Sequence, residues 1–118
     1  MNFKTVIAYI FLMICMFVAG TALSQNMCNS DICVVQFNAS WNASNSVDYL
    51  EKLTDCEVMN ISIDEGTYQS DYKIVVVPTI IVFNGKEVER FQANIMMQME
   101  ATRKDVQNAI DNIIYSDF

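Results

Sequence analysis

The stretch that decides the fold is YKIVVVPTIIVFNGKEVERF, Tyr72 to Phe91. Its middle, Thr79 to Phe83, is a run of β-branched and aromatic residues, which is typical of a buried strand. Asn84-Gly85 is the best hairpin signal in the chain, because both residues accept the left-handed backbone of a tight turn. Lys86 to Phe91 is predicted to return as the antiparallel partner strand. Pro78 is the only proline of the chain and stands directly before this hairpin.

Two further strands are predicted upstream. Cys33 to Phe37 is a short apolar run, and Cys56 to Ile63 alternates apolar and polar residues. Between them, a loop rich in Asn, Ser and Ala (Asn38–Asn45) leads into a short helix. The apolar residues of this helix recur at helical spacing: Val47, Leu50 and Leu53. The resulting strand–helix–strand unit predicts that the two strands are parallel neighbours.

A second short helix is predicted over Thr67–Tyr72, and a longer one begins at Thr102, where Asp105 completes a capping box. This order of elements predicts an α/β fold with a mixed, mostly four-stranded sheet and helices on both faces. Residues 93–100 are ambiguous between helix and strand. Their methionines are interpreted as core filling, with an adaptable binding surface as the alternative: Met96, Met97 and Met99.

Residues 1–24 are interpreted as a secretory signal peptide and residues 25–118 as the domain. Lys4 precedes the apolar segment Val6–Ala19, and small residues follow it, as in cleaved signals. An uncleaved membrane anchor stays open, although the segment is short of the roughly 20 residues that a span needs. A lipid on Cys15 also stays open. We expect an exported protein, periplasmic or secreted, with no membrane contact after cleavage.

The composition argues against several classes of function. After cleavage, six basic and 14 acidic residues remain, a net charge of −8. This charge repels phosphate backbones, so no nucleic acid is expected as a partner. The chain has no histidine, which removes the commonest metal ligand and the commonest general base. We therefore expect neither a metal site nor a cofactor.

From about Cys33 to Ile114 the sequence resembles the thioredoxin family. The similarity is carried by VVQFNASW (34–41), NISID (60–64) and the stretch from residue 72 to residue 91. The spaced combination of FxAxW, VPTxxxF and an Asn-Gly turn is the specific part. The resemblance implies a minimal thioredoxin-like fold.

The same resemblance identifies a degenerate active site. Trp41 matches the tryptophan before the family's redox-active cysteines, and Pro78 matches the cis-proline that faces them. Asn42 and Asn45 stand where the family has the two cysteines of its Cys-x-x-Cys motif, and Gln36 replaces its buried acid. Thiol–disulfide exchange needs a thiolate, which an amide cannot replace. We therefore expect a redox-inactive site and lean against an enzyme.

The favoured function is a non-catalytic module that binds a protein or an extended peptide. Its surface is expected to comprise eight residues: Trp41, Asn42, Ala43, Ser44, Asn45, Val77, Pro78 and Thr79. One alternative is thiol–disulfide exchange at a relocated site, formed by Cys28 with Cys33 or Cys56. Another is a structural piece that assembles through an edge strand.

The cysteines suggest one disulfide. Cys33 and Cys56 begin strands that are predicted to be parallel neighbours, and such strands lie roughly 4.8 Å apart. This spacing is within the range that a disulfide bridges. We expect a Cys33–Cys56 bridge with Cys28 as a free thiol. Pairing of Cys28 with either of the other two, or three free thiols, remains open.

One strand is expected to be an open edge. The family commonly places a strand and a helix before its central strand. The eight residues between the predicted cut and Cys33 are too few for that unit. The strand Cys56–Ile63 is then exposed to pairing by residues 26–31 or by another chain.

Overall fold

The computed structural model describes Cys28 and residues 31–116. The predicted signal peptide lies outside the described residues. The strands are β1 (Cys33–Asn38), β2 (Glu57–Ser62), β3 (Thr79–Phe83) and β4 (Glu87–Gln92). They form one sheet in the order β2-β1-β3-β4, in which β1 is parallel to β2 and antiparallel to β3. The mixed four-stranded sheet is confirmed.

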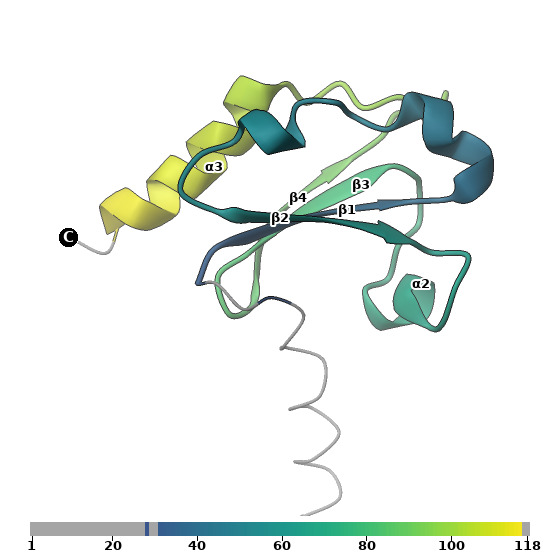
Figure 1. Ribbon diagram of the computed structural model, residues 1–118, viewed down its shortest axis with the longest axis horizontal. Helices are drawn as coiled ribbons and strands as arrows, with labels where there is room; N and C mark the ends of the chain where they lie inside the picture. Colours follow the sequence, from purple (N-terminus) through teal and green to yellow (C-terminus); the bar gives the residue numbers. More distant parts are fainter. Residues whose placement is uncertain (1–27, 29–30, 117–118) are drawn as a thin grey trace, which may run out of the picture.

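Helical elements lie on both faces of the sheet, as predicted (Figure 1). α3 (Arg103–Ser116) covers one face together with two short 3₁₀ helices, η1 (Ser40–Asn45) and η2 (Leu50–Lys52). The single turn of α2 (Tyr68–Asp71) lies on the other side. Every residue of β1 is buried, because this strand is central and has neighbours on both edges and both faces.

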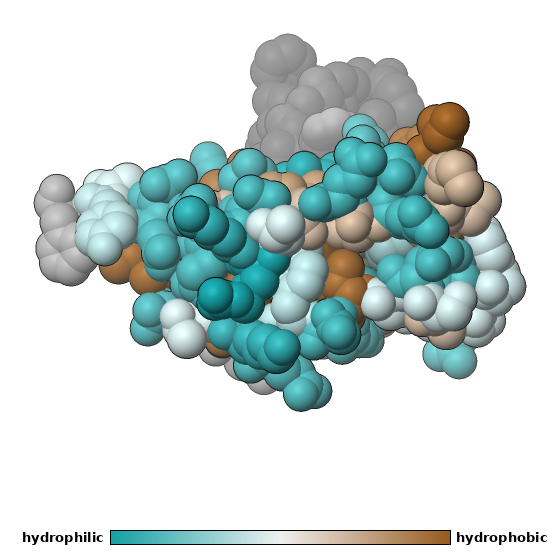
Figure 2. Space-filling view, turned by 90° about the horizontal axis from the view of Figure 1, so that it is seen from above, coloured by the Kyte–Doolittle hydropathy of each residue, from teal (hydrophilic) through white to brown (hydrophobic). Residues whose placement is uncertain are grey.

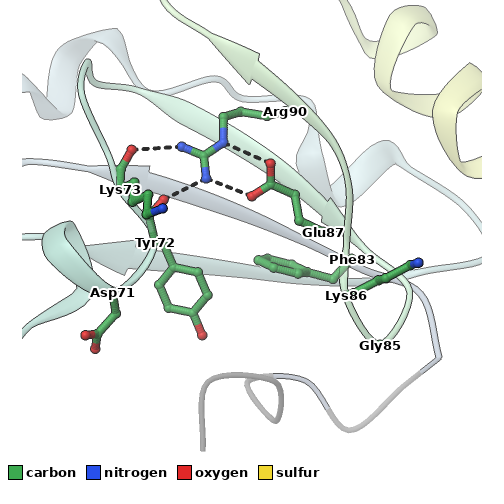
Figure 3. Close-up of a pocket in the computed structure, with 8 residues that line it drawn as sticks. All are labelled: Asp71, Tyr72, Lys73, Phe83, Gly85, Lys86, Glu87 and Arg90. Atoms are coloured by element: carbon green, nitrogen blue, oxygen red, sulfur yellow. Dashed lines mark hydrogen bonds and ion pairs between the residues drawn. The ribbon is translucent and has the colours of Figure 1, made fainter. Parts of the chain in front are cut away.

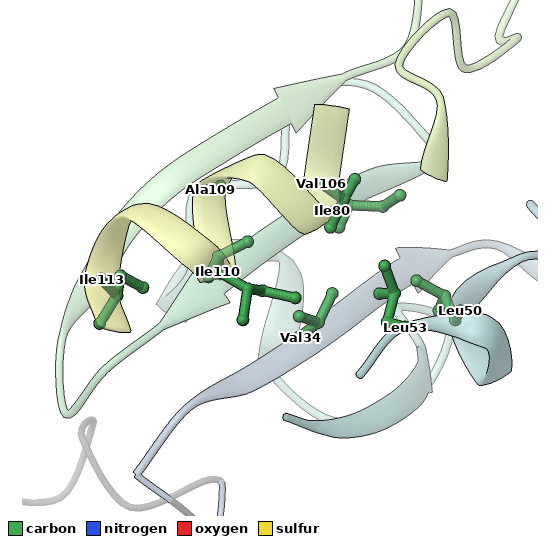
Figure 4. Close-up of a cluster of buried hydrophobic side chains, with 9 residues drawn as sticks. Val34, Leu50, Leu53, Ile80, Val106, Ala109, Ile110 and Ile113 are labelled. Carbon is green, nitrogen blue, oxygen red and sulfur yellow. The ribbon is translucent and has the colours of Figure 1, made fainter. Parts of the chain in front are cut away.

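The larger core lies between the sheet and α3 (Figure 4). One face of the helix buries an apolar stripe: Val106, Ala109, Ile110 and Ile113. Val34 of β1 and Ile80 of β3 meet this stripe from the sheet, and Leu50 and Leu53 close the end near η2. The apolar spacing in α3, and at Leu50 and Leu53, therefore predicted correctly which side chains are buried.

A smaller core lies under the opposite face. It contains Cys33, Val35 and Phe37 of β1 and Ile81 of β3. Tyr72, from the turn after α2, covers it by packing against two aromatic rings. Its ring centroid is 5.2 Å from that of Phe37 and 5.8 Å from that of Phe83. These contacts hold α2 against the sheet.

The α-helix expected between the loop and β2 is replaced by η1 and η2. Local side chains compete for the backbone there, which disfavours a continuous helix. The Asn38 side chain donates to the Asn42 carbonyl at 3.0 Å and to the Ser46 hydroxyl at 2.7 Å. The Val47 amide donates to the Gln36 side chain at 2.8 Å. These bonds divide the segment into two separate turns.

Two local predictions are confirmed. At the start of α3, the Thr102 amide donates to the Asp105 carboxylate at 2.8 Å, and the Asp105 amide donates to the Thr102 hydroxyl at 3.3 Å. This is the capping box. In the hairpin between β3 and β4, Gly85 has φ of 79°, the left-handed backbone that the Asn-Gly pair signals.

The predicted disulfide is wrong. Cys33 is bonded to Cys28, with 6.0 Å between their Cα atoms, and Cys56 is the free cysteine among the residues that the structure describes. Successive side chains of a strand point to opposite faces, so a shift of one residue changes the face. Cys33 pairs in register with Glu57, not with Cys56. Cys33 therefore lies in the smaller core, whereas Cys56 packs against the larger one.

Candidate functional site

Three loops meet at one end of the sheet. η1 follows β1, residues 72–78 lead into β3, and residues 93–98 follow β4. The Val77–Pro78 peptide is cis, as the resemblance implied, and the Ala93 amide donates to the Pro78 carbonyl at 3.1 Å. The positions that the sequence singled out therefore come together in space.

Asn42 is the central link between these loops. It is only 5% exposed. Its amide donates to the Val77 carbonyl at 3.2 Å and to the Asn38 side chain at 3.1 Å, and it reaches the Met97 carbonyl at 3.5 Å. Its side-chain oxygen accepts from Asn45 at 2.8 Å. The residue at the first cysteine position thus holds the site together and is not part of its surface.

A groove of about 260 Å³ opens beside this amide cluster, and we call it the Trp41 groove. Eight of its ten lining residues are apolar and none is charged: Trp41, Ile63, Gln69, Ile74, Val75, Val76, Val77, Asn94, Ile95 and Met97. Trp41 is 67% exposed, Val75 78% and Ile95 98%. Figure 2 shows strongly apolar residues at the surface of the right-hand end of the molecule, the end at which η1 lies in Figure 1.

A tight turn presents one wall of the groove. The Asn94 side-chain oxygen accepts from the amides of Met96 at 2.9 Å and Gln98 at 3.1 Å. The backbone closes the turn as well: the Asn94 amide donates to the Gln98 carbonyl at 3.0 Å, and the Met97 amide donates to the Asn94 carbonyl at 2.9 Å. Ile95 is therefore held in the solvent by a hydrogen-bonded turn.

The residues of the predicted binding surface lie in different places. Trp41 and Val77 line the groove, and Pro78 and Thr79 are buried behind it. The remaining residues of η1 do not line it: Asn42, Ala43, Ser44 and Asn45. Trp41 is exposed and available for contact with a partner.

Sequence reasoning missed Val75 and Ile95, and it offered Met97 as part of a binding surface only as the alternative to core filling. The signal was present, because Ile95-Met96-Met97 is an apolar run with no regular period outside a predicted element. The interpretation of Met96 and Met97 as core filling is wrong, since both are exposed. It is correct for Met99, which packs against the larger core.

The described cysteines do not line the groove, and Ser40 fastens the loop beside it. The Ser40 hydroxyl and amide both donate to the Asp64 carboxylate, and these bonds lower the pKa of Asp64. They join the start of η1 to the end of β2. The free thiol is elsewhere, on Cys56, where burial and then Asp55 raise its pKa and disfavour the thiolate. Cys33, the buried member of the disulfide, also lies away from the groove's lining.

A second hollow, of about 300 Å³, lies between the end of α2 and the β3–β4 hairpin (Figure 3). Its central Arg90 donates to the Glu87 carboxylate at 2.7 and 3.2 Å. The same guanidinium donates to the carbonyls of Tyr72 at 2.6 Å and Lys73 at 2.9 Å. Arg90 therefore makes four structural hydrogen bonds, which fasten the α2 turn to β4.

Ionisation of Tyr49 is expected to destabilise the domain at alkaline pH. Burial, followed by the charges of Asp105 and Asp48, raises the pKa of Tyr49 from 10.0 to about 12, and its hydroxyl donates to the Ala101 carbonyl at 2.6 Å. A pKa raised by folding gives stability that is complete below pH 10 and is lost as the pH rises towards 12. We expect the free energy of unfolding, from urea titrations, to fall across this range.

This fall in the free energy of unfolding at high pH should be smaller in Tyr49→Phe. Tyr115→Phe is the matched control, because Tyr115 is exposed on α3, and it should keep the whole fall. An equal fall in both variants would contradict the assignment to Tyr49.

Two kinds of site are not found in Cys28 and residues 31–116. No group of three or more His, Cys, Asp or Glu side chains there could hold a metal ion. No helix in this part of the chain is both long and apolar enough to cross a membrane.

Comparison with known proteins places the fold. No protein-family model and no curated protein matches the sequence. Solved structures do match: a mutant thioredoxin from Halobacterium salinarum has a TM-score of 0.56 and 25% identity over 78% of this chain and 82% of that one. A mutant thioredoxin from Entamoeba histolytica has a TM-score of 0.53 and 21% identity over 81% and 92% of the two chains. The oxidised thioredoxin of Plasmodium falciparum has a TM-score of 0.52 and 17% identity over 79% of this chain and 90% of that one. The sheet, the cis-proline loop and these neighbours together show that this chain has a thioredoxin-like fold.

Proposed function

We propose that this protein is an exported, non-catalytic domain that binds an extended peptide in the Trp41 groove. The observation that carries the proposal is the group of exposed apolar side chains, led by Trp41, Val75 and Ile95, around an uncharged hollow. Exposed apolar patches that are this well defined mark interaction sites.

The size of the hollow favours a side chain over a whole small molecule. Its volume of about 260 Å³ is below the range of roughly 300–1,000 Å³ that is usual for ligand pockets. One bulky apolar side chain of a peptide would fill it. The lining has no charge and the chain carries a net charge of −7, so a neutral or basic peptide suits it better than an acidic one.

The backbone beside the groove supports a peptide in extended form. The amide groups of Val75, Val76 and Val77 donate to no acceptor in the described part of the chain. A buried or half-buried donor without a partner is costly, and the carbonyl groups of an extended peptide would satisfy it. Apolar contact and backbone pairing would then act together.

Two observations support export. The N-terminal apolar segment has the character of a signal peptide. The Cys28–Cys33 disulfide suits an oxidising compartment, such as the periplasm or the extracellular space.

Trp41 supplies its own reporter, because it is the only tryptophan of the chain. Random peptides displayed on phage are selected on the protein, and synthetic copies of the enriched peptides are titrated against it. Binding in the groove should shift the Trp41 emission to shorter wavelength. Trp41→Ala carries no tryptophan, so its affinity is measured by isothermal titration calorimetry alongside the wild type; it should bind about tenfold or more weakly, the effect expected for an aromatic anchor.

Tyr115→Ala is the matched control, since Tyr115 is an aromatic residue of similar exposure on α3. It should bind normally. Peptides that bind the wild type and Trp41→Ala with equal affinity would refute the groove as the binding site.

A further inference from the structure

We propose that two copies of this chain pair through the outer edges of β2 to form one continuous antiparallel sheet. β2 is an edge strand, and it lies at the front of the sheet in Figure 1. From Val58 to Ser62 it has no charged residue and no proline, and its register with β1 is unbroken. Edge strands normally carry charged residues, prolines or bulges, which prevent pairing with another strand.

The opposite edge of the same sheet provides the comparison. β4 carries Glu87, Glu89 and Arg90, and its pairing with β3 is interrupted between Val82 and Phe83. Charges and a bulge are two of the devices that protect an edge. The molecule thus protects one edge and leaves the other able to pair.

The outer edge of β2 offers its backbone groups in a regular row. The Glu57 amide donates to Ile32 and the Ile63 amide donates to Asn38, both at 3.0 Å, so these residues face β1. Backbone groups alternate in direction along a strand. Those of Val58, Asn60 and Ser62 therefore face away from the sheet.

This row is complementary to itself. In an antiparallel pair centred on Asn60, Val58 stands opposite Ser62 of the second copy, which allows about six backbone hydrogen bonds in all. Met59 then stands opposite Ile61 of the second copy, so the apolar side chains of one face meet. Glu57 stands opposite Ile63, and no acidic residue faces another.

Cys28 lies on a face of the sheet and not along this edge. The disulfide keeps Cys28 beside Cys33, which pairs with Glu57, the first residue of β2. Cys28 also packs against the smaller core. The positions from Val58 to Ser62 lie further along β2, and their self-complementary row fits a second copy of the chain.

The two-fold pairing leaves the Trp41 groove open. The groove lies at the end of the sheet where β1 and β2 finish, and antiparallel pairing points these ends in opposite directions. Each dimer would therefore present two grooves at its two ends.

A single cysteine tests the register. Opposed residues of a hydrogen-bonded pair have Cα atoms about 5.5 Å apart, within the range of a disulfide. In a Cys56→Ser background, Asn60→Cys should give a covalent dimer on mild oxidation. Ser62→Cys is the matched control and should not, because Ser62 faces Val58. Equal cross-linking of both variants, or of neither, would overturn the proposal.

The wild-type protein, as isolated, tests the pairing without substitution. Sedimentation equilibrium should show a dimer that dissociates on dilution, and hydrogen exchange at Val58, Asn60 and Ser62 should slow as the protein concentration rises. Ser62→Pro removes an outward amide from each copy and should weaken the dimer roughly tenfold. Ser62→Ala should not. A monomer at every concentration, or protection that does not depend on concentration, would overturn the proposal.

Discussion

Asn42→Ala is expected to lower the free energy of unfolding by about 2–4 kcal/mol, although it removes only a small polar side chain. The substitution deletes the donor to the Val77 carbonyl and to the Asn38 side chain, and the acceptor of Asn45. Asn42 is buried, so water does not replace these partners. Each buried group left without a partner costs about 1–3 kcal/mol.

Urea denaturation followed by circular dichroism measures this loss, with an unchanged slope if the unfolded state is unaffected. Asn45→Ala is the matched control, because the half-buried Asn45 contributes one bond to the same cluster. It should cost about 0.5–1.5 kcal/mol. Equal losses in the two variants would show that Asn42 is not the central link.

Ile110→Ala should destabilise the domain by about 2–5 kcal/mol, the usual range for a large apolar residue truncated in a core. Ile110 is fully buried between α3 and the sheet, among Val34, Ile80 and Leu53 (Figure 4). The loss combines the lower apolar burial with the cavity that remains. A reduced urea midpoint at constant slope is the expected result.

Asn108→Ala is the control on the same helix. Asn108 is exposed on α3, so its substitution should change the free energy of unfolding by no more than about 0.5 kcal/mol. If Ile110→Ala changed stability as little as Asn108→Ala, the helix would not be packed on the sheet as the structure shows.

Local signals predicted most of the fold, because the elements concerned are encoded by neighbouring residues. Thr79–Phe83 and the Asn84-Gly85 turn contain both the strand and its reversal. Thr102 and Asp105 mark the start of α3, and the helical spacing of its apolar residues marks the buried face.

The features that were not predicted depend on strand register and on side-chain hydrogen bonds that periodicity does not encode. The choice of Cys28 as the partner of Cys33 rests on a register one residue away from the expected one, and periodicity alone does not fix register. The interruption of the helix after β1 rests on bonds from Asn38 and Gln36, which reach it only in the folded sheet. The exposure of Ile95 rests on the turn closed by Asn94, where a run of apolar residues would ordinarily suggest burial.

The short, irregular form of η1 bears on what cysteines at positions 42 and 45 would do. η1 is a 3₁₀ segment from Ser40 to Asn45 with a kink at Asn42, and no long helix begins at that position. The field at the start of a long helix is one of the effects that turns a thiol into a reactive thiolate. The double substitution Asn42→Cys and Asn45→Cys would therefore give ordinary thiols and would also remove the amide cluster that holds the loops. The backbone of η1, and not only its two asparagines, thus separates this segment from a helix start that activates a thiol.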